Sequence, residues 1–332
     1  MFRVGVDMRW PVHTGIGVMQ REVIKRIVPE MAVCDLRVPG SIGSPLSPLC
    51  VAASILGNRQ KLDLFWNPGF MPPAFCRLPS VVTVHDLTHL KFYSKLHVAY
   101  YQVVLRPLYR KCDVVVCVSN YTKNEFLDWS GIPDDRVITI WNGVDVELFR
   151  GAVPVRLGFP YVLYPGNHRK YKNVSRLIAA YANSFLPGRG IRLVFTGEPQ
   201  AETMKVAARN GVAELMMFSG RLSAEGIAGL YKGALAVAFV SLYEGFGLPL
   251  LESMAAGVPV MTSDVTSLPE IAGSAALIID PYRTDAISNG LEIISEDSEL
   301  RRKLVAEGFS RVAEFSWDKT ASRLWDLVAT LV

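Results

Sequence analysis

Short apolar runs alternate with helical segments along the whole chain, and this alternation constrains the fold more than any other feature. Apolar residues at i, i+3 and i+4 spacing, as in 173–185 and 224–234, predict the helices between the runs. Buried strands separated by such helices predict parallel sheets covered on both faces, an α/β fold. The expected strands are 2–7, 33–38, 62–66, 80–84, 113–118 and 137–140 in the first half, and 161–165, 191–196, 214–218, 235–240, 258–262 and 276–280 in the second.

The length of 332 residues favours two domains, because a single core of this size is uncommon. The alternation lapses over 147–160, a stretch rich in Gly and Pro, and restarts at Tyr161. We therefore expect domains over 1–152 and 153–332, with the helical stretch 317–331 crossing back to the first. Doubly wound sheets bind ligands at the carboxyl ends of their strands, so a shared central cleft is expected.

Composition indicates the cellular compartment in which the protein is expected. The five cysteines are scattered among apolar residues, which predicts reduced thiols. The first residues resemble a strand rather than a signal peptide, and no apolar window is long enough to span a bilayer. Residues 1–150 hold 17 Lys and Arg against 13 Asp and Glu, whereas 151–332 hold 18 of each. We expect a cytoplasmic protein whose first half faces something anionic other than nucleic acid.

The densest motif lies in 241–260, where a buried strand runs into a Gly-containing turn and a helix that starts near Leu248. The amides of Phe246, Gly247 and Leu248 would point together at the positive end of that helix, which suits a phosphate. Glu244 precedes the turn and Glu252 follows it. One carboxylate is expected to face a sugar hydroxyl beside the phosphate while the other reaches a ribose.

These residues resemble a known family. The stretch 244–252 is similar to the E-x7-E motif of the family 4 retaining glycosyltransferases, and the resemblance is strongest over 160–281. It implies the GT-B fold, two Rossmann-like domains facing a central cleft, with the acceptor on the first domain and the nucleotide sugar on the second. It further implies that Glu244 contacts donor-sugar hydroxyls and Glu252 the donor ribose.

A cationic loop opens the second domain. Gly166 ends a strand, and four cationic or potentially cationic residues follow within 168–172, which suits a diphosphate. Lys172 matches a lysine of the family. Many members carry Arg directly after the glycine, where this chain has Asn167, so Arg169 is expected to substitute for that arginine.

Two further loops of the first domain carry expected site residues. Gly15 and Gly17 would let the backbone approach a ligand closely, although Gln20 replaces the third glycine of a dinucleotide fingerprint. The resemblance places this loop against the donor phosphates and Gly15 also on the acceptor side. It implies that His85 hydrogen-bonds a donor hydroxyl and stabilises positive charge in the catalytic site, and that Ser119 lines the acceptor side.

No metal-ligand pattern occurs in the sequence, and the family works without a metal, so we expect neither a metal nor another cofactor. The resemblance also implies retention of configuration, with the departing β-phosphate taking the acceptor's proton. Catalysis would then consist of positioning and electrostatic stabilisation.

Residues 91–111 mix five Lys and Arg with five aromatic residues. This composition fits a helix lying on an anionic membrane surface and fits equally a core helix with basic ends. On the membrane interpretation, the enzyme would sit on the inner face of the cell membrane. Its acceptor would be a lipid-linked glycan used in lipopolysaccharide, O-antigen or exopolysaccharide assembly.

Several functions remain open at this point. The stretch in which Lys172 and Asn173 follow Gly166 looks most like that of mannosyltransferases using GDP-mannose, but UDP- and dTDP-sugar enzymes share much of the pattern. A non-hydrolysing nucleotide-sugar epimerase has the same architecture. A hydride-transfer enzyme is disfavoured by Gln20, and a non-catalytic two-lobed sugar-binding protein is disfavoured by the cationic loop.

Overall fold

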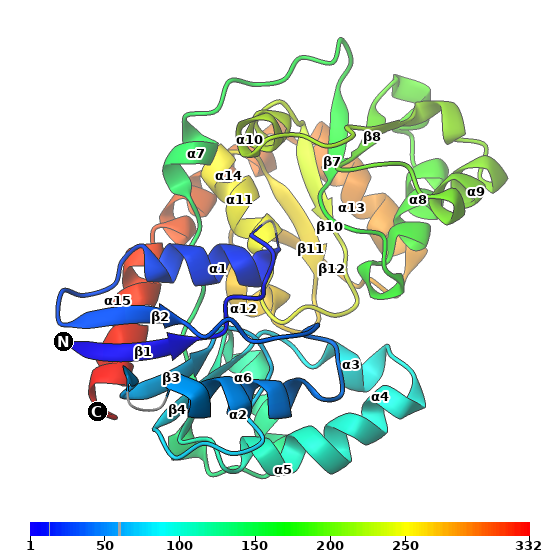
Figure 1. Ribbon diagram of the computed structural model, residues 1–332. Helices are drawn as coiled ribbons and strands as arrows, with labels where there is room; N and C mark the ends of the chain where they lie inside the picture. Colours follow the sequence, from blue (N-terminus) through cyan, green and yellow to red (C-terminus); the bar gives the residue numbers. More distant parts are fainter. Residues whose placement is uncertain (13, 59–60) are drawn as a thin grey trace. The chain divides into compact units, whose positions relative to one another are not determined.

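The structure is a computed structural model that describes residues 1–12, 14–58 and 61–332. It contains two compact units, drawn in Figure 1. Unit 1 comprises residues 1–143 and 317–332, and unit 2 comprises residues 144–316. Each unit is built on one six-stranded sheet in which all paired strands are parallel. The expected α/β class is confirmed.

Unit 1 has the strand order β2-β1-β3-β4-β5-β6. All six strands expected from the sequence are present, although β2 begins two residues earlier than its apolar run suggested. The strands are β1 (Phe2–Val6), β2 (Met31–Asp35), β3 (Leu64–Asn67), β4 (Ser80–Val84), β5 (Val114–Cys117) and β6 (Val137–Thr139). The helices are α1 (Gly15–Ile24), α2 (Ser47–Asn58), α3 (Thr88–Lys91), α4 (Lys95–Tyr100), a π-helix (Tyr101–Leu105), α5 (Arg106–Tyr109), α6 (Asn120–Ser130), a 3₁₀ turn (Asp134–Arg136) and α15 (Trp317–Ala329).

Helix α15 belongs to unit 1 because its apolar face is buried there. Trp317, Leu324 and Trp325 join the core that α1 forms with one face of the sheet. The Trp325 ring meets that of Trp66 edge to face, with centroids 5.6 Å apart, and its Nε1 donates to the Val23 carbonyl at 3.2 Å. The second face of the sheet is covered by a separate core that includes α2 and α6.

Unit 2 has the strand order β12-β11-β10-β7-β8-β9, and again all six expected strands are present. Helices α8 and α13 pack on one face of the sheet and α10 and α11 on the other (Figure 1). The strands are β7 (Tyr161–Tyr164), β8 (Arg192–Phe195), β9 (Met216–Phe218), β10 (Ala236–Phe239), β11 (Val260–Ser263) and β12 (Ala276–Ile279). The helices are α7 (Val146–Arg150), α8 (Val174–Asn183), α9 (Ala201–Arg209), α10 (Ala224–Lys232), α11 (Leu248–Ala256), α12 (Leu268–Ala272), α13 (Thr284–Glu296) and α14 (Ser298–Val312), with 3₁₀ turns at Lys170–Lys172, Pro187–Arg189 and Ala213–Leu215.

The first unit ends at Gly143, before the Gly- and Pro-rich stretch at which the sequence analysis divided the chain after residue 152. Helix α7 already packs on α10 and α11, with the Phe149 ring meeting the Tyr231 ring edge to face at 5.4 Å. The following loop is also held in unit 2, because the Val155 amide donates to the Gly229 carbonyl at 2.9 Å. The stretch that resembles a linker is therefore a surface loop inside the second unit.

The strand orders show where each sheet can hold a ligand. In unit 2 the order reverses between β7 and β10, and in unit 1 it reverses between β1 and β3. At such a switch point the loops leave the two neighbouring strands in opposite directions, and a crevice opens outside their carboxyl ends. The loops after β7 and β10 carry Lys172 and Glu244, and the loop after β1 leads to Gly15.

Two further observations concern the setting of the chain. No helix in the described ranges is both long and apolar enough to cross a membrane. All five cysteines are free thiols, and burial raises the pKa of Cys112 to about 12.

Candidate active site

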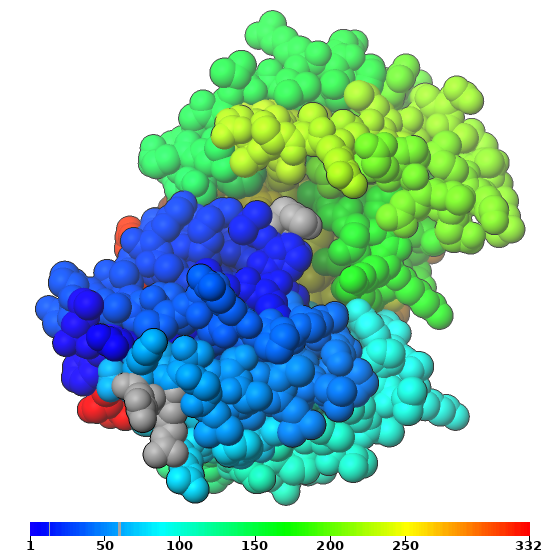
Figure 2. Space-filling view, viewed as in Figure 1, coloured from blue at the N-terminus to red at the C-terminus, as the bar shows by residue number. Residues whose placement is uncertain are grey.

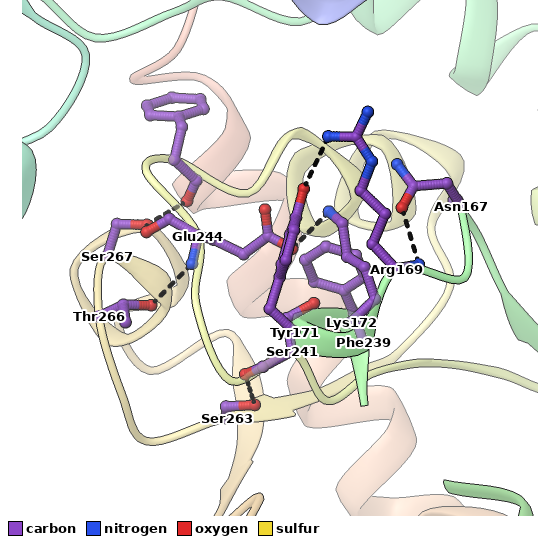
Figure 3. Close-up of polar contacts among 12 residues, drawn as sticks. Asn167, Arg169, Tyr171, Lys172, Phe239, Ser241, Glu244, Ser263, Thr266 and Ser267 are labelled. Carbon is purple, nitrogen blue, oxygen red and sulfur yellow. Dashed lines mark hydrogen bonds and ion pairs between the residues drawn. The ribbon is translucent and has the colours of Figure 1, made fainter. Parts of the chain in front are cut away.

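The centre of the candidate site in unit 2 is an ion pair across the switch point. Lys172 donates from Nζ to Oε1 of Glu244 at 2.6 Å, as Figure 3 shows. Each side chain is 13% exposed, so the pair is accessible to a ligand yet largely shielded from water. The backbone joins the two loops as well, since the Leu242 amide donates to the Tyr171 carbonyl at 2.7 Å.

Aromatic rings complete the surroundings of the Lys172 ammonium. Its Nζ lies 5.2 Å from the centre of the Phe239 ring and 5.6 Å from that of the Tyr171 ring. Arg169 lies on the same side, with Nη1 3.5 Å from the Tyr171 hydroxyl (Figure 3). The structure thus brings together the two cations that the sequence assigned to a diphosphate.

Gly166 gives the cationic loop its path. Its φ of +119° lies in a region that side chains rarely adopt, and its amide donates to Oγ1 of Thr196 at 2.8 Å. The Tyr164 hydroxyl donates to the Asn167 carbonyl at 2.9 Å, which holds the turn against the end of β7. The glycine and these two hydrogen bonds therefore define the shape of the loop.

Helix α11 begins at Leu248, as the sequence predicted, and Gly247 precedes it with a φ of +112°. A Cβ atom on Gly247 would lie 2.8 Å from Cδ2 of Leu268, so together with the positive φ a larger residue would strain this turn. The amides of Gly247 and Leu248 stand at the helix N-terminus, where a helix offers no acceptor of its own. Phe246 is buried, and its carbonyl accepts from the Ser267 hydroxyl at 2.9 Å.

Glu252 lies one turn further along α11. Its Oε2 accepts a hydrogen bond from the Tyr231 hydroxyl at 2.6 Å. Burial raises the pKa of Glu252, and the bond from Tyr231 opposes that rise. The two glutamates of the motif thus differ in their partners, one bound to a cation and the other to a neutral hydroxyl.

Three site-building residues were not found from the sequence alone. Asn173 adopts a φ of +62°, and its buried Nδ2 donates to the carbonyls of Val240 and Pro281. Thr266 accepts from the Glu244 amide at 3.3 Å, and Ser267 donates to the Glu244 carbonyl at 3.0 Å. These contacts join loops that are distant in sequence, so the sequence did not reveal them. The residue type at position 173 was the one available signal, because asparagine tolerates positive φ better than most residues.

In unit 1, His85 follows β4 and is fixed by a backbone carbonyl. Its Nε2 lies 2.8 Å from the Pro68 oxygen. A carbonyl oxygen only accepts, so Nε2 carries the proton and Nδ1 keeps its lone pair. Burial lowers the pKa of His85 below the ordinary value of 6.5, which keeps the imidazole neutral at pH 7. This neutral ring can accept a hydrogen bond from a hydroxyl, whereas the sequence analysis also assigned it the stabilisation of positive charge.

A buried polar network supports the Pro68 carbonyl. Asn67 accepts from the Gly69 amide at 2.8 Å and donates to Oδ2 of Asp7 at 3.2 Å. Asp7 is itself paired with Arg9, whose Nη2 lies 2.7 Å from Oδ2. These contacts join the loops after β1 and β3 at the switch point of unit 1.

The two glycines at the start of α1 have different environments. Gly15 is exposed, so its backbone is accessible from solvent. Gly17 is buried, and a Cβ atom there would lie 2.0 Å from the Pro11 carbonyl oxygen. The glycine at position 17 is therefore required by the packing of the loop on itself, and its contact with a ligand stays a prediction.

Ser119 is completely buried and caps α6. Its Oγ accepts from the Thr122 amide at 3.0 Å and donates to the Thr122 hydroxyl at 3.0 Å. The Ser119 side chain therefore does not line an accessible surface, as was expected for the acceptor side. Its hydroxyl points into the fold and caps the start of α6.

Within residues 91–111, α4, the π-helix and α5 form one continuous helical run from Lys95 to Tyr109, and Lys91 is the last residue of α3. Tyr101, Leu105 and Tyr109 are buried, whereas Leu96 is 79% exposed and Val103 is 74% exposed. The segment, coloured cyan, forms part of the surface seen in Figure 2.

Three of the five basic residues in this segment hold neighbouring structure. Lys91 pairs with Glu125, and Arg106 and Arg110 donate to the Ser130 carbonyl at the end of α6. The segment is therefore a core helix on one side, as one of the two interpretations predicted, while it presents apolar residues on the other.

Within the described ranges, no three His, Cys, Asp or Glu side chains gather in a way that could hold a metal ion.

Comparison with known proteins agrees with this geometry. The family model described as Glycosyl transferases group 1 matches residues 145–311, and that described as Glycosyltransferase Family 4 matches residues 18–148. Since the first match alone spans half of the chain, the protein belongs to the glycosyl transferases of group 1, and the second match supports its resemblance to family 4. It is a glycosyltransferase, and its membership leaves the epimerase, hydride-transfer and sugar-binding alternatives without support.

Individual relatives are similar over large parts of the chain. The O-antigen chain mannosyltransferase B of Escherichia coli is 29% identical over 277 residues, which cover 78% of this chain and 72% of the relative. The serotype-specific mannosyltransferase WbdA of Escherichia coli is 28% identical over 231 residues, 64% of this chain but 28% of that longer protein.

Solved structures establish the fold. Sucrose-phosphate synthase from Thermosynechococcus elongatus superposes with a TM-score of 0.80 at 18% identity, over 100% of this chain and 99% of that one. With two parallel six-stranded sheets, this likeness identifies the GT-B fold that the sequence motifs implied.

Proposed function

We propose that this glycosyltransferase moves a hexose, with mannose from GDP-mannose as the first candidate, to a glycan or lipid-linked glycan. The observation that carries the proposal is the Lys172–Glu244 pair beside the N-terminus of α11. A cation for a departing diphosphate and a carboxylate for sugar hydroxyls stand at one switch point. Mannose is favoured because the relatives just described are mannosyltransferases, and O-antigen or a related surface polysaccharide is the product class they suggest.

The residue roles follow from charge and position. Lys172, Arg169 and the helix amides stabilise the negative charge that grows on the diphosphate as the sugar leaves. Glu244 accepts hydrogen bonds from sugar hydroxyls, and Glu252 accepts from the ribose. Gly166 and Gly247 let the backbone approach the phosphates.

We further propose retention of configuration without a metal ion or other cofactor. The cations and helix amides supply the positive charge that a divalent ion would supply in other transferases. The β-phosphate oxygen accepts the acceptor's proton, so no protein side chain is needed as the base. In unit 1, the neutral His85 accepts a hydrogen bond from a sugar hydroxyl through Nδ1, and the exposed Gly15 offers backbone to a phosphate or an acceptor.

A thermal-shift panel with GDP, UDP, dTDP, ADP and NAD, each with and without EDTA, tests the donor and the metal. A ligand that binds only the folded state stabilises it, by about 2.7 kcal/mol at a hundredfold excess over Kd, and so raises the melting temperature. We expect a selective shift by GDP that EDTA leaves unchanged. A selective shift by UDP or dTDP would replace the donor, and a shift that EDTA abolishes would contradict metal independence.

Transfer itself is tested with GDP-mannose and a lipid-linked acceptor fraction. The anomeric configuration of the product, read from its one-bond carbon–proton coupling, reports retention. Inversion at the anomeric carbon would contradict the proposed mechanism. Mannose release without an acceptor product would contradict transfer.

We also propose that residues 91–111 contact an anionic membrane surface, with the protein peripheral on the cytoplasmic side. Support comes from the exposed Leu96 and Val103, with the exposed ammonium groups of Lys95 and Lys111 in the same segment. Co-flotation with phosphatidylglycerol vesicles is expected to fall with salt and to fail in the Leu96→Asp/Val103→Asp variant. Leu49→Asp, at another exposed apolar residue of unit 1, is the control.

A further inference from the structure

One polar contact of the candidate site joins two neighbouring helices of unit 2. Tyr231 lies near the end of α10 and Glu252 lies on α11, and the two helices pack side by side (Figure 1). The Tyr231 hydroxyl donates to Oε2 of Glu252 at 2.6 Å, a short bond as expected for a carboxylate acceptor. No hydrogen bond from a residue in the described ranges reaches Oε1 of Glu252.

Tyr231 is closely packed on all sides. Its side chain is 0% exposed, and its ring meets that of Phe149 edge to face. Helix α10 lies directly against the loop before β7, because a Cβ on Gly229 would lie 2.7 Å from the Val153 oxygen, and one on Gly233 2.2 Å from the Val155 oxygen. The preceding residue of the helix is also tied, since the Tyr161 hydroxyl donates to the Leu230 carbonyl at 2.7 Å.

A glutamate has three rotatable side-chain bonds, so its carboxylate would otherwise occupy many orientations. We propose that Tyr231 is a positioning residue that holds Oε2 of Glu252, so that Oε1 faces the ribose hydroxyls of the nucleoside diphosphate. This inference rests on the proposed function, in which Glu252 accepts from the ribose. Tyr231 itself does not touch the substrate, because it is completely buried.

The bond also favours the charged form of Glu252. Burial raises the pKa of this carboxyl group and the Tyr231 hydroxyl lowers it. Tyr231 therefore has two effects on Glu252: it orients the carboxylate, and it favours the ionised form of that carboxylate.

The test is the ratio of Kd values for a nucleoside diphosphate and its 2′-deoxy or 3′-deoxy form, measured by calorimetry with GDP and with UDP. In the natural protein we expect at least one deoxy form to bind about tenfold more weakly, the scale of one hydrogen bond to a charged group. Glu252→Ala should abolish this discrimination, and Tyr231→Phe should reduce it by about threefold or more. Adding Tyr231→Phe to Glu252→Ala should change the ratio no further.

Tyr181→Phe is the matched control. Tyr181 is also completely buried, and its hydroxyl donates at 2.7 Å to a backbone carbonyl, that of Ile191. Both Phe variants are expected to lower the melting temperature, but only Tyr231→Phe should change the ribose discrimination.

The outcomes separate this inference from the proposed function. If the deoxy forms discriminate and Tyr231→Phe keeps the natural ratio, or weakens both nucleotides equally, the positioning role is overturned while the function stands. If neither GDP nor UDP binds the natural protein, the proposed function fails, and the role of Tyr231 fails with it.

Discussion

The Lys172 ammonium and the Glu244 carboxylate form a close ion pair, with Nζ and Oε1 2.6 Å apart, although 72 residues separate them in the chain. Each side chain of this pair is 13% exposed. On the proposed function, a nucleotide sugar offers a phosphate to the lysine and hydroxyls to the glutamate. Binding would then exchange one ion pair for two sets of charge-assisted hydrogen bonds.

Replacement of Lys172 by Ala should remove most of the catalytic rate. The ammonium is the positive group that meets the growing charge on the diphosphate, and loss of one such group costs about 100- to 1,000-fold in kcat. The measurement is the steady-state rate of sugar transfer. Lys170→Ala, two positions away and exposed, is the control and should keep a rate near that of the natural protein. A near-natural rate for Lys172→Ala would contradict the assignment of Lys172 to the diphosphate.

Replacement of Glu244 by Gln should separate nucleotide binding from sugar transfer. The change removes a negative charge beside the phosphates and releases Lys172, so GDP alone should bind roughly threefold to tenfold more tightly. Transfer from the nucleotide sugar should fall, because the sugar hydroxyls lose their charged acceptor. Calorimetry with GDP and a transfer assay report the two effects, and weaker GDP binding would contradict the competition for Lys172.

Stability should fall as the pH drops below 6.5, the ordinary pKa of histidine, because the folded-state pKa of His85 is lower. In that window the unfolded chain takes up a proton that the folded protein resists. The stability present above pH 6.5 is therefore lost as the pH falls towards the folded-state pKa. Each pH unit between the two values corresponds to about 1.4 kcal/mol.

Thermal unfolding between about pH 7.5 and about pH 5 measures this loss. His85→Gln should reduce the loss without abolishing it, since burial also lowers the pKa of His168. The exposed His97→Gln serves as the control. Identical pH profiles for His85→Gln and the natural protein would show that His85 titrates normally when folded.

Replacement of Gly69 by Ala should destabilise unit 1 through a steric conflict. A Cβ atom there would lie 2.2 Å from Nε1 of Trp10, so the ring or the backbone has to move. We expect a loss of about 1–3 kcal/mol in the free energy of unfolding, measured by urea denaturation. Gly57→Ala is the control, because a Cβ on that residue of α2 meets nothing within 4 Å. Equal stability of the two variants would mean that Trp10 moves aside freely.

Local patterns predicted the elements well, because they depend on nearby residues. All twelve strands overlap the apolar runs that predicted them, with ends shifted by up to three residues, and α11 begins at the predicted Leu248. Prediction was poorer where a local signal has two meanings. The Gly- and Pro-rich stretch after Gly151 resembled a linker, but Val155 is bound to α10 in unit 2. Ser119 resembled a site residue, but its hydroxyl caps α6.

The sequence by itself determined the α/β class, the approximate strand positions and the family, and it pointed to the two glutamates and to Lys172 as candidate site residues. Those features depend on periodicity, turn chemistry and short spacings, which a chain carries locally. Only the tertiary structure decided that β7 and β10 are neighbours, that Tyr231 holds Glu252, and that a backbone carbonyl fixes His85. The reason is that these contacts form when separate helices and strands pack, and the partner of a buried polar group is set by that packing rather than by its neighbours in sequence.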